Sequence, residues 1–247
     1  MKIDFTYIIN LNTSNTEIKD KMDQIPFGTE MKYYILAATN GWEAVKDATK
    51  SRFKFKLADW WKSDKFGDEP FYNRDITPGE AGCMLSHYEC ISNGYNDKNQ
   101  NNILIFEEDF VPRGKFPTAK VLSEVPADCS ILYLDRSAME PDKETAITKN
   151  VTEVGYTYNN HAYIVTKKGM KEIVESSILD NIIVTDEFYP AINGTSKRLD
   201  AVKIFHNPKF KAYALNESFF GQTSDPDVDS LTEFTPEEVN TMKKKPT

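Results

Sequence analysis

The sequence has no long apolar run, no surplus of positive charge and few cysteines. No segment approaches the run of about 18 apolar residues that a membrane-spanning helix requires, so we expect no transmembrane segment. Its 38 acidic residues outnumber the 30 basic ones, and the formal net charge is −8. Nucleic acid and anionic membranes both favour a basic surface, so this charge argues against either as a partner. A phosphate-bearing ligand would need a few local cations or a metal.

The cysteines and the start of the chain bear on its location. Cys83, Cys90 and Cys129 do not form an even disulfide framework, and they are not spaced as a zinc site. Residues 1–5 (MKIDF) have a carboxylate where a signal peptide would have a basic stretch and then an apolar run. The two features together predict a reducing, cytoplasmic location.

Short apolar segments alternate with helical patterns along the chain, which predicts an α/β layered sheet with ligands beyond the carboxyl ends of its strands. Hydrophobic residues make up 40% of the chain, enough for one domain with a substantial core. We expect residues 1–223 to form that domain and residues 224–247 to be a polar tail. The expected strands are 5–11, 33–38, 103–106, 131–134 and 161–166, and the expected helices are 77–92 and 168–179.

The clearest helix start combines three residues. Thr77 suits the N-cap, Pro78 suits the first helical position, and Glu80 completes a capping box. We expect this helix to run to about Ser92 and to be ended by residues 93–94 (Asn-Gly).

Three carboxylates, Glu107, Glu108 and Asp109, directly follow the apolar strand at 103–106. They cannot all be buried and charged, because an unpaired buried charge costs several kcal/mol or changes its protonation. A hard divalent cation would resolve the conflict. Residues two apart on an extended chain point the same way, so Glu107 and Asp109 could share one metal. An acidic loop at a strand end explains the pattern equally well.

At these residues the chain resembles glycosyltransferase family 25, which includes bacterial lipooligosaccharide galactosyltransferases and collagen hydroxylysine galactosyltransferases. Residues 74–88 (RDITPGEAGCMLSHY) are similar to the family's R-x-x-T-x-G-E-x-G-C-x-L-S-H helix, and residues 103–109 (ILIFEED) to its I-L-E-D-D strand end. Further similar blocks are residues 9–11, 161–169 (G-T-H-A-Y-L-I-S-x-x-G), 184–188 (P-V-D-E-F) and 222–225 (Q-x-S-D).

The resemblance implies a GT-A-like single domain with a central mixed sheet, whose acidic motif binds Mn²⁺ or Mg²⁺ together with the donor diphosphate. Carried over to this chain, Glu107 and Asp109 are metal ligands, and Glu108 contacts the sugar or ribose. The other implied donor-binding residues are Asn10, Arg74, Glu80, Ser86, His87 and His161.

The chain also differs from the family pattern. Glu108 stands where Asp is typical, and residues 159–160 (Asn-Asn) replace Gly-Thr before His161. Residues 13–15 lack the arginines usual after the first strand. The last two differences concern the choice of donor and leave the metal chemistry untouched.

The family members named above form β-linkages from α-linked donors, which implies inversion by a single in-line attack. Such an attack needs a general base on the acceptor hydroxyl. As a hypothesis we place the base at Asp186 and take the adjacent Glu187 as a second catalytic residue, in the segment similar to P-V-D-E-F. The implied donor is UDP-galactose, with UDP-glucose next. The implied acceptor is a glycan, such as a lipopolysaccharide core, or a hydroxylated protein side chain.

Several of these residues also have structural explanations. Glu80 could serve only the capping box, His87 and His161 could be satisfied structural histidines, and Arg74 could form a surface ion pair.

Two other functions stay open from the sequence. One is a non-catalytic protein of the same fold that binds a glycan or a nucleotide sugar. The other is a non-haem iron oxygenase that uses His87 and Glu89 with His161 or His206. Residues 87 and 89 are two apart on the expected helix and do not face the same side, which argues against the oxygenase.

Overall fold

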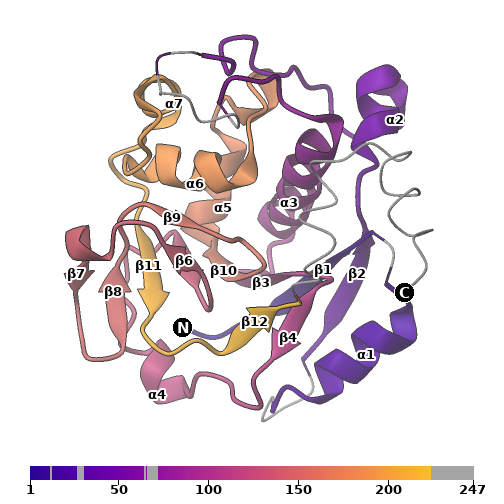
Figure 1. Cartoon of the computed structure of the whole chain (residues 1–247). Coiled ribbons are helices and arrows are strands. Elements are labelled where there is room, and N and C mark those ends of the chain that lie inside the picture. The colour runs from indigo at the N-terminus through magenta and orange to yellow at the C-terminus, as the bar shows by residue number, and fades with distance from the viewer. Residues whose placement is uncertain (12, 27–30, 64, 66–71, 224–247) are drawn as a thin grey trace, which may run out of the picture.

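The computed structural model describes residues 1–11, 13–26, 31–63, 65 and 72–223. Across these residues the chain forms a mixed sheet of eight strands with helices on both faces (Figure 1). The predicted α/β fold, a central mixed sheet flanked by helices, is confirmed. The expected tail, with the motif residues Ser224 and Asp225, lies outside the described residues, so the domain boundary at residue 223 stays a prediction.

The strands of the sheet follow an order that differs from their order in the chain. In spatial order they are β2 (Tyr33–Ala37), β1 (Phe5–Asn10), β3 (Asn102–Glu107), β10 (Ala162–Thr166), β5 (Ile131–Tyr133), β11 (Ala212–Leu215), β8 (Val151–Glu153) and β7 (Thr145–Ala146). Two short ribbons stand beside the sheet: β4 (Phe110–Pro112) with β12 (Phe220–Gln222), and β6 (Ser137–Ala138) with β9 (Thr157–Tyr158). All five predicted strands are present within one residue at each end.

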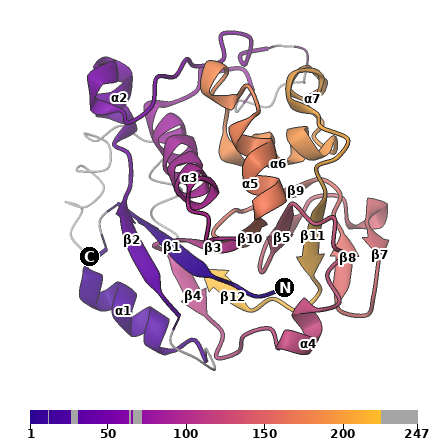
Figure 2. The same ribbon diagram turned by 180° about the vertical axis from the view of Figure 1, so that it is seen from behind.

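The helices cover both faces of the sheet. They are α1 (Asn15–Asp23), α2 (Gly41–Lys46), α3 (Pro78–Asn96), α4 (Ala119–Leu122), α5 (Lys167–Val174), α6 (Thr185–Asn193) and α7 (Leu199–Phe205), with 3-10 turns at Ala48–Lys50, Pro141–Lys143 and Ile178–Asp180. Figures 1 and 2 show α3, α5 and α6 together on one side of the sheet and α1 and α4 on the other. No helix in the described ranges is long and apolar enough to cross a membrane.

Alternate residues of the central strands face two separate cores. In β3, Ile103 and Ile105 pack in the core that includes α3, α5 and α6, whereas Leu104 and Phe106 pack in the core that includes α1 and α4. All four side chains are fully buried. Successive side chains of a strand point to opposite faces of the sheet. Because helices cover both faces here, the odd and the even positions of the strand must both be apolar.

The strand directions bring chemistry-bearing residues to one edge of the sheet. β1, β2 and β3 are parallel, and β10 is antiparallel to both β3 and β5. The carboxyl ends of β3 and β5 therefore lie at the same edge as the amino end of β10. Glu107 ends β3, Asp135 follows β5 and His161 precedes β10, so all three lie at this edge.

Helix α3 begins as predicted but ends later. Thr77 is its N-cap, and the capping box with Glu80 is formed. The predicted end at residues 92–94 is wrong, because α3 continues to Asn96 and Asp97 is its C-cap. Gly94 lies inside the helix, close to Ile103 of β3, where a Cβ atom would come within 2.9 Å of a methyl group of that isoleucine. This glycine therefore allows close helix–sheet packing and does not mark a helix end.

The second predicted helix, 168–179, is also shorter than expected. Helix α5 covers Lys167–Val174, and Ile178–Asp180 is a separate 3-10 turn. The chain turns between them, where the hydroxyl of Ser176 donates a hydrogen bond to the carbonyl of Ile173 over 2.7 Å.

Two glycines allow α2 and α3 to cross closely. A Cβ atom on Gly82 would lie 2.6 Å from the carbonyl oxygen of Thr39, and one on Gly41 would lie 1.6 Å from that of Pro78. Both contacts are to backbone atoms, which cannot rotate away. The glycine of the motif around residue 82 therefore fixes the position of α3 above the loop after β2.

Candidate active site

Glu107 and His87 form the centre of the site. His87, on α3, is fully buried, and its Nε2 lies 2.8 Å from Glu107 Oε1 at the end of β3. Its Nδ1 lies 2.6 Å from the hydroxyl of Tyr163, which in turn lies 2.8 Å from the hydroxyl of Tyr189. Burial opposes ionisation of Glu107, but the hydrogen bond from His87 and the electrostatic effect of His87 and His161 outweigh it and lower the pKa of Glu107.

Asp109 lies in the turn between β3 and β4. Its Oδ2 accepts a hydrogen bond of 2.7 Å from Gln222 Nε2, and its backbone carbonyl accepts one of 2.9 Å from the amide of Thr223. Its Oδ1 is buried and has no hydrogen-bond partner among the described residues. Burial, followed by the negative charge of Glu107, raises the pKa of Asp109 to about 6. A cation between these two carboxylates would remove this repulsion.

Glu108, the middle acid, points elsewhere. Its Oε2 accepts hydrogen bonds from the backbone amides of Leu11 (2.8 Å) and Thr13 (2.9 Å). The side chain of Asn10 hydrogen-bonds both the amide and the carbonyl of Thr13. Glu108 and Asn10 therefore shape the loop after β1 beside the acidic turn. The expectation that either contacts the donor stays a prediction.

The predicted base, Asp186, lies near Glu107 in the first turn of α6. Its Oδ1 accepts a hydrogen bond of 3.1 Å from the amide of Asn159 and one from the side-chain amide of Asn160. Burial, and next the charge of Glu107, raise the pKa of Asp186 to about 7. A carboxylate with such a pKa can exchange a proton near neutral pH, as general acid–base chemistry requires.

Glu187, by contrast, is enclosed by hydroxyl groups. Its Oε1 accepts hydrogen bonds from Tyr72 (2.7 Å), Tyr158 (2.6 Å) and Tyr156, and its Oε2 accepts one of 2.6 Å from Ser196. The residue is fully buried. Four donors occupy the lone pairs that a base would use, so the geometry favours a positioning role for Glu187. No local sequence pattern indicates this cluster, because its members lie far apart in the chain.

Arg74 and Glu80 pair with each other at the start of α3. The guanidinium makes two hydrogen bonds to the Glu80 carboxylate, at 2.7 and 2.9 Å. Glu80 Oε2 also accepts a hydrogen bond from the amide of Thr77, which completes the capping box. Ser86 donates to the carbonyl of Gly82 and accepts from the amide of Thr39. These contacts give the three predicted donor-binding residues structural roles, and their donor contacts stay predictions.

His161 lies at the same edge of the sheet and is almost fully buried. Its Nε2 lies 3.1 Å from Asp135 Oδ2. Burial of Asp135 is outweighed by its contacts with His161 and Ser218, which lower its pKa. Asp135 ends an apolar run in the sequence just as Glu107 does, and that repeated pattern is the signal that could have marked it as a site residue.

One group of three residues has the spacing of a metal site. Cys83 Sγ, a nitrogen of His87 and a carboxylate oxygen of Glu107 all lie within 4.8 Å of one another. Cys83 and His87 are one turn apart on α3. Sequence reasoning singled out Glu107 but compared Cys83 only with the other cysteines.

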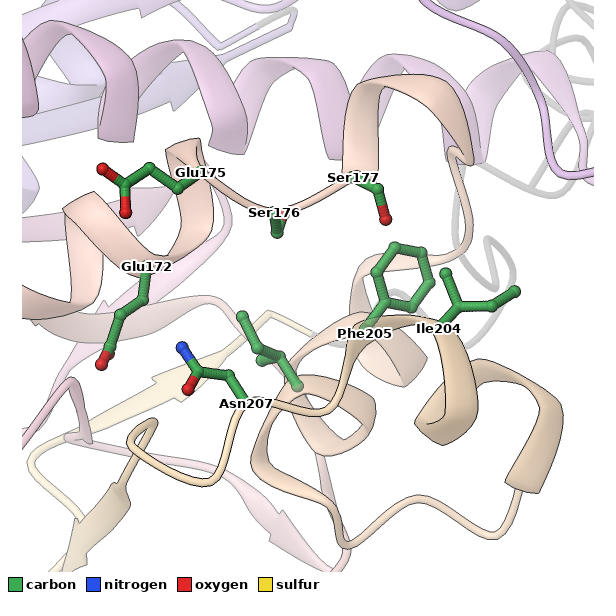
Figure 3. A pocket seen from close by; sticks show the side chains of 8 residues that line it. Glu172, Glu175, Ser176, Ser177, Ile204, Phe205 and Asn207 are labelled. Carbon is green, nitrogen blue, oxygen red and sulfur yellow. The ribbon is translucent and has the colours of Figure 1, made fainter.

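The described residues also line cavities away from these acids. One cavity, of about 330 Å³, lies between the end of α5 and α7. Figure 3 shows Glu172, Glu175, Phe205 and Asn207 among the side chains around it. None of the predicted site residues lines it. A second cavity, of about 490 Å³, is lined in part by Tyr156, so it adjoins the tyrosine cluster around Glu187.

Glu107, Asp109 and Asp186 all lie in a part of the chain that matches one protein-family profile. The profile described as "Glycosyltransferase family 25 (LPS biosynthesis protein)" matches residues 3–189. The chain belongs to glycosyltransferase family 25. Four residues that contact the acids discussed above lie beyond the matched range, namely Ser196, Ser218, Gln222 and Thr223.

Named relatives are consistent with this family. The chain is 32% identical over 245 residues to the procollagen lysyl hydroxylase and glycosyltransferase of Acanthamoeba polyphaga mimivirus, which covers 92% of this chain and 26% of that protein. It is 22% identical over 222 residues to human procollagen galactosyltransferase 2, which covers 87% of this chain and 34% of that protein. The chain thus spans about a quarter to a third of the length of these relatives.

A solved structure similar to the chain is a mutant Drosophila β-1,4-galactosyltransferase 7 in complex with manganese, UDP-Gal and xylobiose. The TM-score is 0.40 and the sequence identity 9%, over 98% of this chain and 80% of that one.

The backbone at Asn159 is unusual. This residue has a φ of 70°, in the left-handed region that favours glycine. In the family motif that residues 161–169 resemble, glycine stands at the position of Asn159, which is one of the differences noted above. Asparagine tolerates the left-handed region better than most residues. The backbone amide of Asn159 can therefore still reach Asp186.

Proposed function

We propose that this family 25 chain transfers a hexose from a UDP-sugar to an acceptor hydroxyl with inversion, and that Glu107 and Asp109 hold a divalent cation, Mn²⁺ or Mg²⁺. Galactose is the sugar we expect first, because human procollagen galactosyltransferase 2 is a relative, and glucose is next. The acceptor is a glycan or a hydroxylated protein side chain. The observation that carries the proposal is the buried Oδ1 of Asp109, which lacks a hydrogen-bond partner among the described residues and lies close to a second carboxylate.

The residues at this edge fit a hard cation. Both acids supply oxygen ligands, which Mg²⁺ and Mn²⁺ prefer, and such ions keep positions for phosphate oxygens. Glu107 raises the pKa of Asp109, so the two charges repel each other when no cation is bound. When bound, a cation here would neutralise charge that develops on the departing nucleoside diphosphate.

Asp186 is the group that we expect to take the proton of the acceptor hydroxyl. Asn159 and Asn160 both hold its Oδ1, while its Oδ2 receives no hydrogen bond from the described part of the chain. The fixed oxygen sets the direction of the carboxylate, and the other oxygen is open to a substrate. Its pKa of about 7 makes proton uptake possible near neutral pH.

The test is a panel of UDP-sugars with Mn²⁺, measured as slow hydrolysis without acceptor and as transfer with candidate acceptors. EDTA should abolish both reactions, and added Mn²⁺ should restore them. Asp109→Asn keeps the shape of the side chain but removes its charge, so we expect both rates to fall by about tenfold or more. Glu175→Gln, at an exposed position on another part of the surface, is the control that should leave both rates unchanged.

Two outcomes would count against this proposal. Turnover that is insensitive to EDTA and to Asp109→Asn would remove the cation from the reaction. Donor binding without turnover of any UDP-sugar would instead support the non-catalytic binding protein.

A further inference from the structure

Helix α3 carries a thiol, that of Cys83, and an imidazole, that of His87, close to the end of β3. The proposed transfer reaction gives this pair no role as metal ligands. Cys83 and His87 are four residues apart, so they lie on the same face of the helix. Their ligand atoms and a carboxylate oxygen of Glu107 all lie within 4.8 Å of one another. His87 Nε2 already contacts Glu107 Oε1 at 2.8 Å. A thiol, an imidazole and a carboxylate thus converge on one point.

Each of the two helix residues also has a partner that would orient it toward a metal. The second nitrogen of His87 lies 2.6 Å from the hydroxyl of Tyr163. Metal-binding histidines commonly donate their other N–H to such a group, which fixes the ring and its tautomer. Cys83 Sγ lies 3.5 Å from the hydroxyl of Thr185, which can donate to a thiolate. The site therefore has its supporting contacts in place.

We propose that Cys83, His87 and Glu107 form a binding site for a divalent cation that favours sulfur and nitrogen ligands, namely Zn²⁺. Zinc holds sulfur at about 2.3 Å and nitrogen or oxygen at about 2.0–2.2 Å, so small side-chain rotations would bring these three atoms around one ion. Thiolate and imidazole favour zinc over Mg²⁺ and Mn²⁺, which favour oxygen. Three protein ligands leave a fourth position open for water.

Zinc in this site uses the same Glu107 that the hard cation needs. A zinc ion bound to Cys83, His87 and Glu107 therefore leaves the hard cation with Asp109 but without Glu107 as a ligand, and so inhibits transfer. Zinc binding itself is independent of the proposed function, whereas the inhibition rests on it. The two parts are tested separately.

The binding test uses the full chain with metal alone and no donor sugar. Zn²⁺ is titrated by calorimetry, and Co²⁺ is used as a spectroscopic substitute whose thiolate ligand produces a charge-transfer band. We expect one Zn²⁺ per chain and a cobalt–thiolate band. Cys83→Ala should weaken zinc binding by roughly tenfold or more and remove the band. Cys90→Ala is the matched control, because Cys90 lies on the same helix but is buried in the core.

Circular dichroism and thermal unfolding without metal establish that both variants fold. Cys83→Ser is a second variant that keeps a small polar side chain and should behave as Cys83→Ala does. A parent protein that binds no Zn²⁺, or a cobalt–thiolate band that persists in Cys83→Ala and disappears in Cys90→Ala, overturns the proposal.

The inhibition test measures transfer with Mn²⁺ as Zn²⁺ is added, each protein relative to its own rate without zinc. The parent should be inhibited, more Mn²⁺ should relieve the inhibition, and Cys83→Ala should require roughly tenfold more zinc or higher. Equal zinc sensitivity in the parent and in Cys83→Ala would overturn the competition for Glu107. Loss of all transfer activity would concern the proposed function, and the binding test would still decide the zinc site.

Discussion

Replacing Asp186 by asparagine is expected to stabilise the protein above neutral pH and to slow sugar transfer. Burial and the charge of Glu107 raise the pKa of Asp186 from 3.8 to about 7. The folded chain therefore keeps this proton in a pH range where the unfolded chain has lost it. Between about pH 4 and pH 7 the folded state binds more protons, so its stability falls as the pH rises. Asparagine has no such proton to lose.

The size of the effect follows from the shift. About three pKa units correspond to about 4 kcal/mol if the carboxylate is fully shielded from solvent. Asp186 is partly exposed, so solvent screening lowers the expected gain to about 1–2 kcal/mol. The amide oxygen of asparagine can still accept the hydrogen bonds from Asn159 and Asn160. The gain should be full above about pH 7 and absent below about pH 4.

Urea unfolding of the parent and of Asp186→Asn at pH 4 and pH 8, both in EDTA, measures the stability arm. Transfer with Mn²⁺ at pH 8 measures the activity arm, where we expect a loss of about tenfold or more with donor binding preserved. Glu175→Gln, at an exposed position, should change neither quantity.

An equal change in stability at both pH values would refute the electrostatic explanation, because a change in packing alone does not depend on proton uptake. An Asp186→Asn variant that is less stable than the parent at pH 8 would also refute it. Unchanged turnover would show that Asp186 is not the base, whatever the stability result.

Three further substitutions test the structure around the site. Glu187→Ala leaves the hydroxyl groups of Tyr72, Tyr156, Tyr158 and Ser196 without their shared acceptor and should cost about 3–5 kcal/mol in urea unfolding, whereas Glu187→Gln keeps an acceptor oxygen and should cost about 1–2 kcal/mol; equal costs would contradict the role of these hydrogen bonds. Gly82→Ala should cost about 1–3 kcal/mol, because the new Cβ meets backbone, and an unchanged unfolding midpoint would contradict the close crossing. Asn159→Val should cost about 1–3 kcal/mol at its left-handed φ and Asn159→Gly less, and a thermal melt that ranks them in reverse would refute the strain.

The central strands and the acidic turn were predictable because their signals are local. Ile103 to Phe106 are all apolar, and the carboxylates follow them directly in the chain, so a buried strand with acids at its end required no knowledge of the fold. The start of α3 was equally local, because Thr77 and Glu80 form the capping box with each other. The end of α3 was not, because Gly94 looks like a stop signal until the strand packed against it is known.

The roles of individual acids depended on contacts across the chain. Glu107 and Glu108 are neighbours, yet one contacts His87 of α3 and the other the loop after β1. The alternation of a strand predicts opposite directions but not what lies on each side. For Glu187 the separation is larger, since the tyrosines that surround it come from residues 72, 156 and 158. Asp186 and Glu187 are adjacent and have the same character in the sequence. Within the described ranges, however, Oδ2 of Asp186 receives no hydrogen bond, whereas Glu187 is enclosed by hydroxyl groups.

The proposed zinc site shows where local patterns stop being sufficient. Cysteines compared with one another gave no metal spacing, yet Cys83 and His87 are four residues apart on a predictable helix, which is enough to place two ligands on one face. Two ligands do not define a site. The third, Glu107, comes from another element, and only the position of α3 above the end of β3, set in part by Gly82 at the crossing with α2, brings its carboxylate within reach. A substitution at Gly82 that moved α3 would therefore weaken zinc binding without touching any ligand.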